Sequence, residues 1–200
     1  IKSGAYGKFD KLFTVMRSMR PILVHGLGYF EHTGMKDINI CDSPHYGFHI
    51  CIKNSDMYEG MTDKDIYKLM CNNIKIFKKN IKVPLLLENI PDSPSERAIF
   101  DHYPYIMPDE INRLVLENDV SFLLCLTHAK ITAEFHGWDI HEYIRNLPLD
   151  RVIEIHINGS GYDKDGFPQD THQSMEDEDY SLLEWVLKYT SPKIVTLEYN

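Results

Sequence analysis

Six short apolar runs alternate with amphipathic stretches along the chain, and this alternation limits the fold more than any other feature. The runs are rich in Leu, Ile and Val and occupy residues 21–25, 46–52, 84–90, 120–126, 151–158 and 193–199. The spacing of apolar residues predicts helices over residues 6–19, 62–80, 108–118, 138–146 and 179–189. Near-continuous aliphatic strands that alternate with helices indicate an α/β fold with a parallel sheet covered by helices.

The sheet is expected to be part of a TIM barrel. Glycine-rich phosphate loops would favour a doubly wound sheet, but the chain has neither G-x-G-x-x-G nor G-x-x-x-x-G-K-[S/T]. An eight-stranded barrel usually takes about 250 residues, so six strands in 200 residues predict a barrel that is incomplete at one or both ends. No internal repeat or linker-like segment divides the sequence, and residues 1–200 are expected to form a single barrel domain.

Local signals support several of the helices. Thr62 followed by Asp65 matches a capping box, Pro108 suits a first helical turn, and Pro192 is expected to end the last helix before its strand. The acidic run at residues 176–179 is typical of a helix N-terminus. Aromatic residues on the helical faces are expected to pack on the barrel, and they are Phe13, Tyr67, Phe77, Tyr143 and Trp185.

The composition indicates which classes of partner and which cellular compartment to expect. Thirty Asp and Glu residues against 21 Lys and Arg residues give a formal net charge of −9, which disfavours binding to nucleic acid phosphates. No apolar run approaches the roughly 20 residues needed to cross a bilayer, so no membrane association is expected. Cys41, Cys51, Cys71 and Cys125 form no C-x-x-C pair, and we expect reduced thiols in a cytoplasmic protein.

Residues of metal-ligand type stand at the expected C-terminal ends of all six strands, where the working residues of a TIM barrel lie. They are His25, His49, Glu88, His128, His156 and Glu198. The loop after the fifth run adds Asp170 and His172, whose i, i+2 spacing can aim both side chains to the same side of extended backbone. An ionisable side chain in an otherwise aliphatic strand needs a partner or a metal, because burying it alone is costly.

Eight donors exceed the four that one tetrahedral zinc ion uses, so the sequence predicts two or more ions if the donors converge. Imidazoles and carboxylates suit iron, manganese or zinc. In the fifth run Glu154, His156 and Asn158 share one face, which would give the barrel interior a polar side. A hydrogen-bonded structural role is the alternative for any single histidine of the set. The histidines in loops and helical patterns are expected at the surface, and they are His32, His45, His102, His136 and His141.

Taken together, these motifs resemble those of the multinuclear non-haem iron-dependent oxidative enzymes, a family that includes the methanobactin-biosynthesis oxidase. The matching elements are Val24-His-Gly26, Phe48-His49, Leu87-Glu-Asn89, the L-L-C-L-T-H-A element at 123–129, the L-P-L-D-R-V-I-E-I-H-I-N-G block at 147–159, Asp170-Thr-His172 and Leu197-Glu198. The resemblance runs from about residue 20 to residue 200. The long block followed by D-x-H is its most specific part.

The resemblance implies a xylose isomerase-like barrel that holds two or three iron ions and activates dioxygen as a co-substrate. Such enzymes modify cysteine or another residue of ribosomally made precursor peptides, often with a partner protein that presents the peptide. It implies iron ligands at His25, His49, Glu88, His156, Asp170, His172 and Glu198, with His128 able to serve as well. It places Asn89 and Glu154 near the cluster, and we assign these two residues catalytic roles.

One departure from the family pattern and two other functions stay open. Cys125 stands where the family usually has an aspartate, which leaves one iron site unassigned. The same scaffold also carries divalent-metal sugar isomerases and phosphodiester nucleases, although an isomerase would use a lysine that no strand end offers and a nuclease would favour a basic groove. A non-catalytic barrel that binds a partner protein is the third hypothesis.

Overall fold

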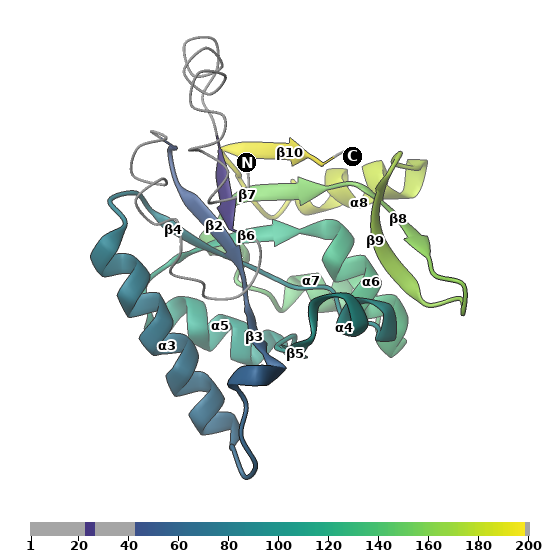
Figure 1. Cartoon of the computed structure of the whole chain (residues 1–200). Helices are drawn as coiled ribbons and strands as arrows, with labels where there is room; N and C mark the ends of the chain where they lie inside the picture. Colours follow the sequence, from purple (N-terminus) through teal and green to yellow (C-terminus); the bar gives the residue numbers. More distant parts are fainter. Residues whose placement is uncertain (1–22, 27–42, 199–200) are drawn as a thin grey trace, which may run out of the picture.

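The computed structural model describes residues 23–26 and 43–198, so the helix expected over residues 6–19 and the positions Phe13, His32 and Cys41 lie outside the described residues. Six parallel strands form the central sheet in the order β1-β2-β4-β6-β7-β10 (Figure 1). Their bounds are Val24–Gly26 (β1), Tyr46–His49 (β2), Leu85–Glu88 (β4), Ser121–Cys125 (β6), Val152–Ile157 (β7) and Ile194–Leu197 (β10). Each expected apolar run supplies one of these strands, and sequence order equals spatial order.

The sheet is strongly curled. The rings of His25 on β1 and His156 on β7 have centroids 5.4 Å apart, although four strand intervals separate β1 from β7 in the sheet. In a flat sheet these strands would lie about 19 Å apart. The sheet therefore curves so that inward side chains of distant strands meet, as in a TIM barrel. Within the described residues β1 and β10 do not pair, so the barrel is open.

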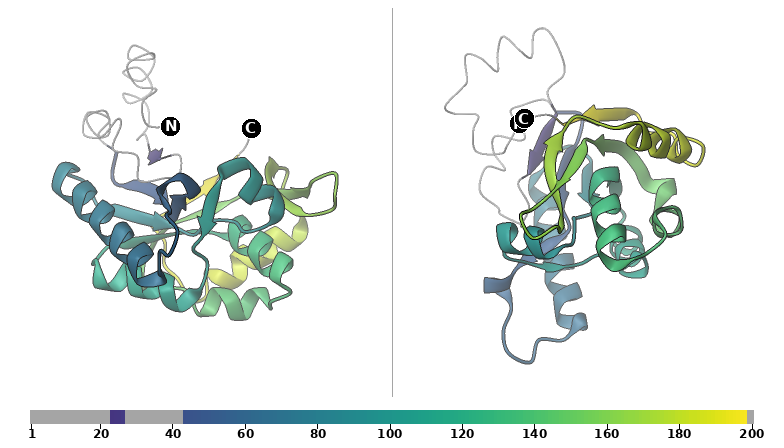
Figure 2. Two further views of the ribbon diagram at one scale, coloured as in Figure 1. Left: turned by 60° about the horizontal axis from the view of Figure 1, so that its bottom comes forward. Right: turned by 90° about the vertical axis from the view of Figure 1, so that its right-hand side faces the viewer.

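Helices cover the outer face of the curled sheet. In the left view of Figure 2 most of the helices lie along one side of the sheet. The expected helices are present as α3 (Asp63–Asn80), α5 (Pro108–Glu117), α7 (Ile140–Arg145) and α8 (Asp177–Val186). The outward aliphatic and aromatic side chains of the strands pack beneath them in one core; Phe77 of α3, for example, stacks on Phe48 of β2 with ring centroids 4.9 Å apart. This apolar layer fixes the sheet register and hence the positions of the inward residues.

The helix start signals are confirmed, whereas the last helix ends at Val186, before the expected stop at Pro192. Thr62 and Asp65 form a capping box at the start of α3, Pro108 occupies the first turn of α5, and the acidic run caps α8. Tyr67, Phe77 and Tyr143 are buried in the core, and Trp185 packs against its edge. None of the described helices is long and apolar enough to span a membrane.

Several elements were not expected from the sequence. The run at 46–52 divides into β2 and the short strand β3 (Cys51–Lys53), which pairs with β5 (His102–Pro104). Two further helices are α4 (Pro94–Phe100) and α6 (Leu126–His136), and two single turns of 3-10 helix occupy Asn54–Asp56 and Leu149–Arg151. An antiparallel hairpin of β8 (Gly159–Tyr162) and β9 (Pro168–Gln173) extends beyond the C-terminal ends of β6 and β7 (Figure 1).

Candidate metal centre

All eight candidate ligands lie at one end of the curled sheet. His25, His49, Glu88 and His156 are on β1, β2, β4 and β7, and Glu198 directly follows β10. Asp170 and His172 come from β9 of the hairpin. His128 differs from the expectation: it lies not at the end of β6 but in the first turn of α6, which begins directly after that strand.

Glu88 lies at the centre of the candidate ligands. This side chain is fully buried, and four imidazoles surround its two oxygens. Oε2 lies 2.5 Å from Nε2 of His25 and 3.2 Å from Nε2 of His49. Oε1 lies 3.4 Å from Nδ1 of His156 and 3.5 Å from Nδ1 of His128. Burial would raise the pKa of Glu88, but the surrounding imidazoles outweigh it and hold the pKa well below its ordinary value.

Six of the eight side chains form a closed ring in which carboxylates and imidazoles alternate. Beyond the two Oε1 contacts of Glu88, its links are His128 Nε2 to Asp170 Oδ2 at 3.2 Å, Asp170 Oδ2 to His172 Nε2 at 3.3 Å, His172 Nε2 to Glu198 Oε2 at 3.9 Å and Glu198 Oε2 to His156 Nδ1 at 3.3 Å. Side chains from five segments of the chain therefore converge on one small volume.

Two groups within this set have the spacing of a metal site. One is His25, Glu88 and His156, and the other is His49, Glu88 and His128. In each group one donor atom per residue lies within 4.8 Å of the others. Because Glu88 belongs to both groups, its carboxylate could offer a donor atom to either of them.

The chemistry of the donors fits bound cations. Among the described residues, the buried atoms Glu88 Oε1 and His156 Nδ1 have no hydrogen-bond partner, although they face each other. Buried polar atoms without partners are rare in folded proteins, and a cation between these two atoms would satisfy both. Burial lowers the pKa of His49 to about 3, so its ring is neutral at pH 7. Burial also disfavours the charged form of His156, but Glu88, Glu154 and Glu198 outweigh it and raise the pKa of His156, so a cation would have to replace a proton there. Neutral imidazole and ionised carboxylate are the forms that bind metals.

Glu154 contacts the imidazole of His156 at Nε2, the ring nitrogen that does not face Glu88. Nε2 of His156 lies 3.1 Å from Oε1 of Glu154, so donation from Nε2 leaves Nδ1 to face Glu88 and Glu198. Thr196 donates a 2.5 Å hydrogen bond to the same Oε1, and His45 pairs with Oε2. A carboxylate that orients an imidazole in this way is a common support for a metal ligand. His45 is buried at 4% exposure, which corrects its expected surface position.

His128 is held by the backbone of Asn89, the residue directly after β4. Its Nδ1 lies 2.8 Å from the carbonyl oxygen of Asn89, and donation to that oxygen leaves Nε2 directed at Asp170. The Asn89 side chain points to the neighbouring strand: Oδ1 accepts from the backbone N of Cys125 and Nδ2 donates to its carbonyl, both at 2.9 Å. Asn89 therefore ties the ends of β4 and β6 together beside the ligands.

The N-terminal turn of α4 contacts the hairpin that carries Asp170 and His172. Glu96, a side chain only 1% exposed, accepts a 2.7 Å hydrogen bond from the backbone N of Asp170. Ser93 donates a 2.7 Å hydrogen bond to the carbonyl oxygen of Pro168. His172 has a backbone φ of +50°, a conformation that non-glycine residues adopt only when surrounding contacts enforce it.

A small cavity opens beside the first metal group. It has a volume of about 100 Å³ and is lined by Leu23, His25, Gly47, Glu154, His156, Thr196 and Glu198. Gly47 makes room here, because a Cβ atom at this position would lie 2.9 Å from Cδ1 of Leu123 and 3.1 Å from Cδ2 of His25.

The family is decided by comparison with known proteins. A family model described as "RiPP precursor modification enzyme MbnB/TglH/ChrH" matches residues 41–200. The chain belongs to this family. A UPF0276 protein of Bordetella pertussis is 28% identical over 149 residues, which cover 72% of this chain and 50% of that protein. A UPF0276 protein of Caulobacter vibrioides is 29% identical over 117 residues, covering 58% and 40%. The chain spans about half the length of the curated relatives it matches.

The fold is also found in a solved structure. The crystal structure of the probable 3-DHS dehydratase AsbF from Bacillus anthracis matches with a TM-score of 0.57 and 11% sequence identity, covering 98% of this chain and 77% of that one. At this identity the likeness concerns the fold alone. It agrees with a TIM-barrel architecture of the xylose isomerase-like kind.

Sequence reasoning missed several residues that support the candidate ligands. His45, Glu96 and Thr196 touch ligands or their supports, yet none lies in a metal-ligand pattern. For Glu96 a signal existed: Ser93, Pro94 and Glu96 form the start pattern of a helix, and Ser93 caps α4. His102 is buried as well, which corrects its expected surface position, whereas His136 is half-buried and pairs with Asp92 at 2.7 Å.

Cys125 occupies the position where the family resemblance predicts an aspartate. Its side chain is fully buried at the end of β6, and Cys125 pairs in register with His156 of β7. Burial raises the pKa of its thiol. Within the described part of the chain Cys71 and Cys125 form no disulfide, in agreement with the expected reduced thiols.

Proposed function

We propose that this chain is the catalytic barrel of an iron-dependent oxidative enzyme. It would bind two or three iron ions and use dioxygen to modify a cysteine, or another residue, of a ribosomally synthesised precursor peptide. The observation that carries this proposal is the position of Glu88 in two adjacent ligand groups. The match to a RiPP precursor modification family supports a peptide as the substrate.

Each of the two ligand groups would hold one ion. His25 and His156 would hold one ion and His49 and His128 a second, with Glu88 between them. Asp170, His172 and Glu198 close the ring on the open side and offer donors for either ion or for a third. When bound, iron in such a donor set supplies redox chemistry with dioxygen and favours the ionised form of a thiol.

The residues around the candidate ligands orient two of the imidazoles and limit what can enter the site. Glu154 keeps Nδ1 of His156 directed at the centre, and the Asn89 carbonyl does the same for Nε2 of His128. The cavity of about 100 Å³ beside His25 equals only a few water molecules, at about 30 Å³ each. It admits the tip of a side chain such as a thiol and excludes a whole peptide segment. The rest of the peptide would remain outside, where a partner protein could present it.

The alternative enzymes on this scaffold are less well supported. No lysine is among the eight candidate ligands or among the residues that line the small cavity, whereas the sugar isomerase hypothesis needs one. The formal charge of −9 disfavours the nuclease hypothesis, which needs a basic groove.

Metal analysis after anaerobic purification tests the proposal. We expect about two irons per chain for the unaltered protein and less than about one-tenth of that for Glu88→Gln. His49→Ala should lose one ion and keep the other, and Glu59→Gln, an exposed carboxylate outside the site, serves as the matched control. Addition of a cysteine-containing peptide should start oxygen uptake. Less than one iron per chain with no oxygen uptake would refute the proposal, and metal loss without loss of partner binding would favour the non-catalytic barrel.

A further inference from the structure

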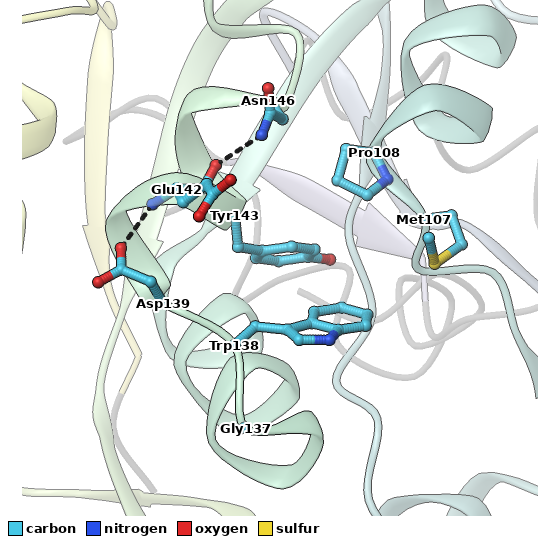
Figure 3. Close-up of a pocket in the computed structure, with 8 residues that line it drawn as sticks. All are labelled: Met107, Pro108, Gly137, Trp138, Asp139, Glu142, Tyr143 and Asn146. Atoms are coloured by element: carbon cyan, nitrogen blue, oxygen red, sulfur yellow. Dashed lines mark hydrogen bonds between the residues drawn. The ribbon is translucent and has the colours of Figure 1, made fainter.

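A second concave site lies outside the metal centre, between the first turns of α5 and α7. It has a volume of about 390 Å³, within the usual range of ligand sites. Figure 3 shows the indole of Trp138 beside the phenol ring of Tyr143, with Met107 and Pro108 facing them. The two rings have centroids 5.5 Å apart and an interplanar angle of 35°. We call this site the Trp138 groove.

The aromatic floor of the groove is rigidly held. Tyr143 is buried and donates a 2.9 Å hydrogen bond to the carbonyl oxygen of Ile106. His136 stacks on Trp138 at a centroid distance of 4.4 Å and an interplanar angle of 17°. Met107, in contrast, is 49% exposed. The groove is therefore a preformed aromatic surface with an accessible flexible wall.

The rim of the groove is negatively charged. Asp139, the N-cap of α7, and Glu142, in the first turn of this helix, both line the groove. The N-terminus of α7 contributes about half a positive charge, so it offsets only part of the charge of these two carboxylates. Arg145, one turn beyond Glu142, lies over the ring of Trp185 at 5.3 Å.

Aromatic rings beneath carboxylates form a recognition site for a cation, because the ring face and the carboxylate both attract positive charge. We infer that the Trp138 groove binds a lysine or arginine side chain of the precursor peptide, with the cation against the Trp138 ring and near Glu142. The inference rests on the proposed function, since it assigns a binding site to that peptide. Among cationic side chains arginine suits the groove best, because its guanidinium can pair with a carboxylate such as that of Glu142 through two parallel hydrogen bonds.

The groove lies near the metal centre. Trp138 packs against Cys51, Ile90 and Ile106. Cys51 and Ile90 follow the candidate ligands His49 and Glu88 by two residues, which is about 7 Å of extended chain. The groove and the metal centre are therefore neighbours in the fold, separated by this buried cluster.

Trp138 fluorescence tests the inference with defined probes. The chain has two tryptophans, so Trp185→Phe makes Trp138 the only reporter. Acetyl-Ala-Arg-Ala-amide should quench this fluorescence with millimolar affinity, and the norleucine peptide of the same length should bind about fivefold more weakly or less. Glu142→Gln in the same background should weaken arginine-peptide binding about fivefold, and Glu59→Gln should leave it unchanged.

Three results would overturn the inference: equal binding of the norleucine peptide, an unchanged affinity in Glu142→Gln, or no quenching up to the solubility limit of the arginine peptide. Glu142 is exposed, so its substitution leaves the core intact, and circular dichroism verifies this. Metal content of the same preparations separates this inference from the proposed function. Bound iron without arginine-dependent binding refutes only the groove, whereas arginine binding without iron refutes only the oxidative centre.

Discussion

The backbone N–H of Asp170 donates a hydrogen bond to Oε1 of Glu96, with 2.7 Å between the heavy atoms. The two residues lie 74 positions apart in the sequence, and this contact fastens the hairpin with two candidate ligands to α4. Burial raises the pKa of Glu96, and within the described residues its second oxygen, Oε2, has no hydrogen-bond partner.

Glu96→Ala should therefore loosen the hairpin and weaken metal binding, because the partly buried Asp170 N–H loses its acceptor at a cost of about 1 kcal/mol. Glu96→Gln should retain most of the affinity, since its amide oxygen can still accept this bond. Titration of the metal-free protein with ferrous ion measures both. Equal metal affinity of Glu96→Ala and the unaltered protein would contradict the anchoring role.

Glu154→Gln should weaken metal binding by about 10–100-fold, the usual effect of removing the carboxylate that orients an imidazole ligand. The reason is that the amide can present its N–H₂ to Nε2 of His156 and so favour the wrong tautomer. Thr196→Val, which removes only the 2.5 Å hydrogen bond to Glu154, should have a smaller effect. Competition with a chelator measures the affinities, and an unaltered affinity in Glu154→Gln would show that His156 needs no such support.

Gly47→Ala should displace the ring of His25, because the added Cβ would come within 3.1 Å of it and within 2.9 Å of Leu123. We expect a loss of stability of about 1–3 kcal/mol from overpacking and a larger loss of the ion held by His25 than of the one held by His49. Urea unfolding and metal analysis give the two quantities. Full metal content in this variant would mean that His25 is not a ligand.

Asp92 gives a pH-dependent contribution to stability. Burial raises its pKa, but hydrogen bonds from Arg97 at 2.6 and 2.7 Å and a contact with His136 at 2.7 Å outweigh burial and keep the pKa below its ordinary value. A lowered pKa means that the ionised form stabilises the fold above about pH 4, and that this stabilisation is lost as the pH falls through the folded-state value.

Asp92→Asn should therefore lower the free energy of unfolding by about 2 kcal/mol near pH 7, and the deficit should shrink towards about pH 3. Urea unfolding at both pH values measures it, with the exposed Asp150→Asn as the control. A deficit of the same size at both pH values would contradict this account.

The parallel sheet could be predicted because each strand is a compact aliphatic run that the outer core buries. The hairpin could not: residues 159–173 combine glycines with polar residues and show no clear alternation. Helix α6 was hidden because it follows β6 without a loop, so His128 was assigned to the strand end; Gly137, which ends the helix in a left-handed conformation, was its visible stop signal.

The candidate ligands could be predicted because ionisable residues stand out at the ends of aliphatic strands. Their supports could not, since a contact such as that of His45 with Glu154, 109 residues away, depends on how the sheet curls. The roles of the eight ligands, and those of Asn89 and Glu154, stay predictions for the experiments above.

The curled sheet gives the candidate ligands a mechanical consequence. His25 stands on one edge strand of the sheet and Glu198 directly follows the other, and both approach His156. No backbone ladder joins these edges within the described residues. A cation bound by ligands from both edges would link β1 to the end of β10 in place of backbone hydrogen bonds. The cooperativity of unfolding is therefore expected to depend on whether metal is bound.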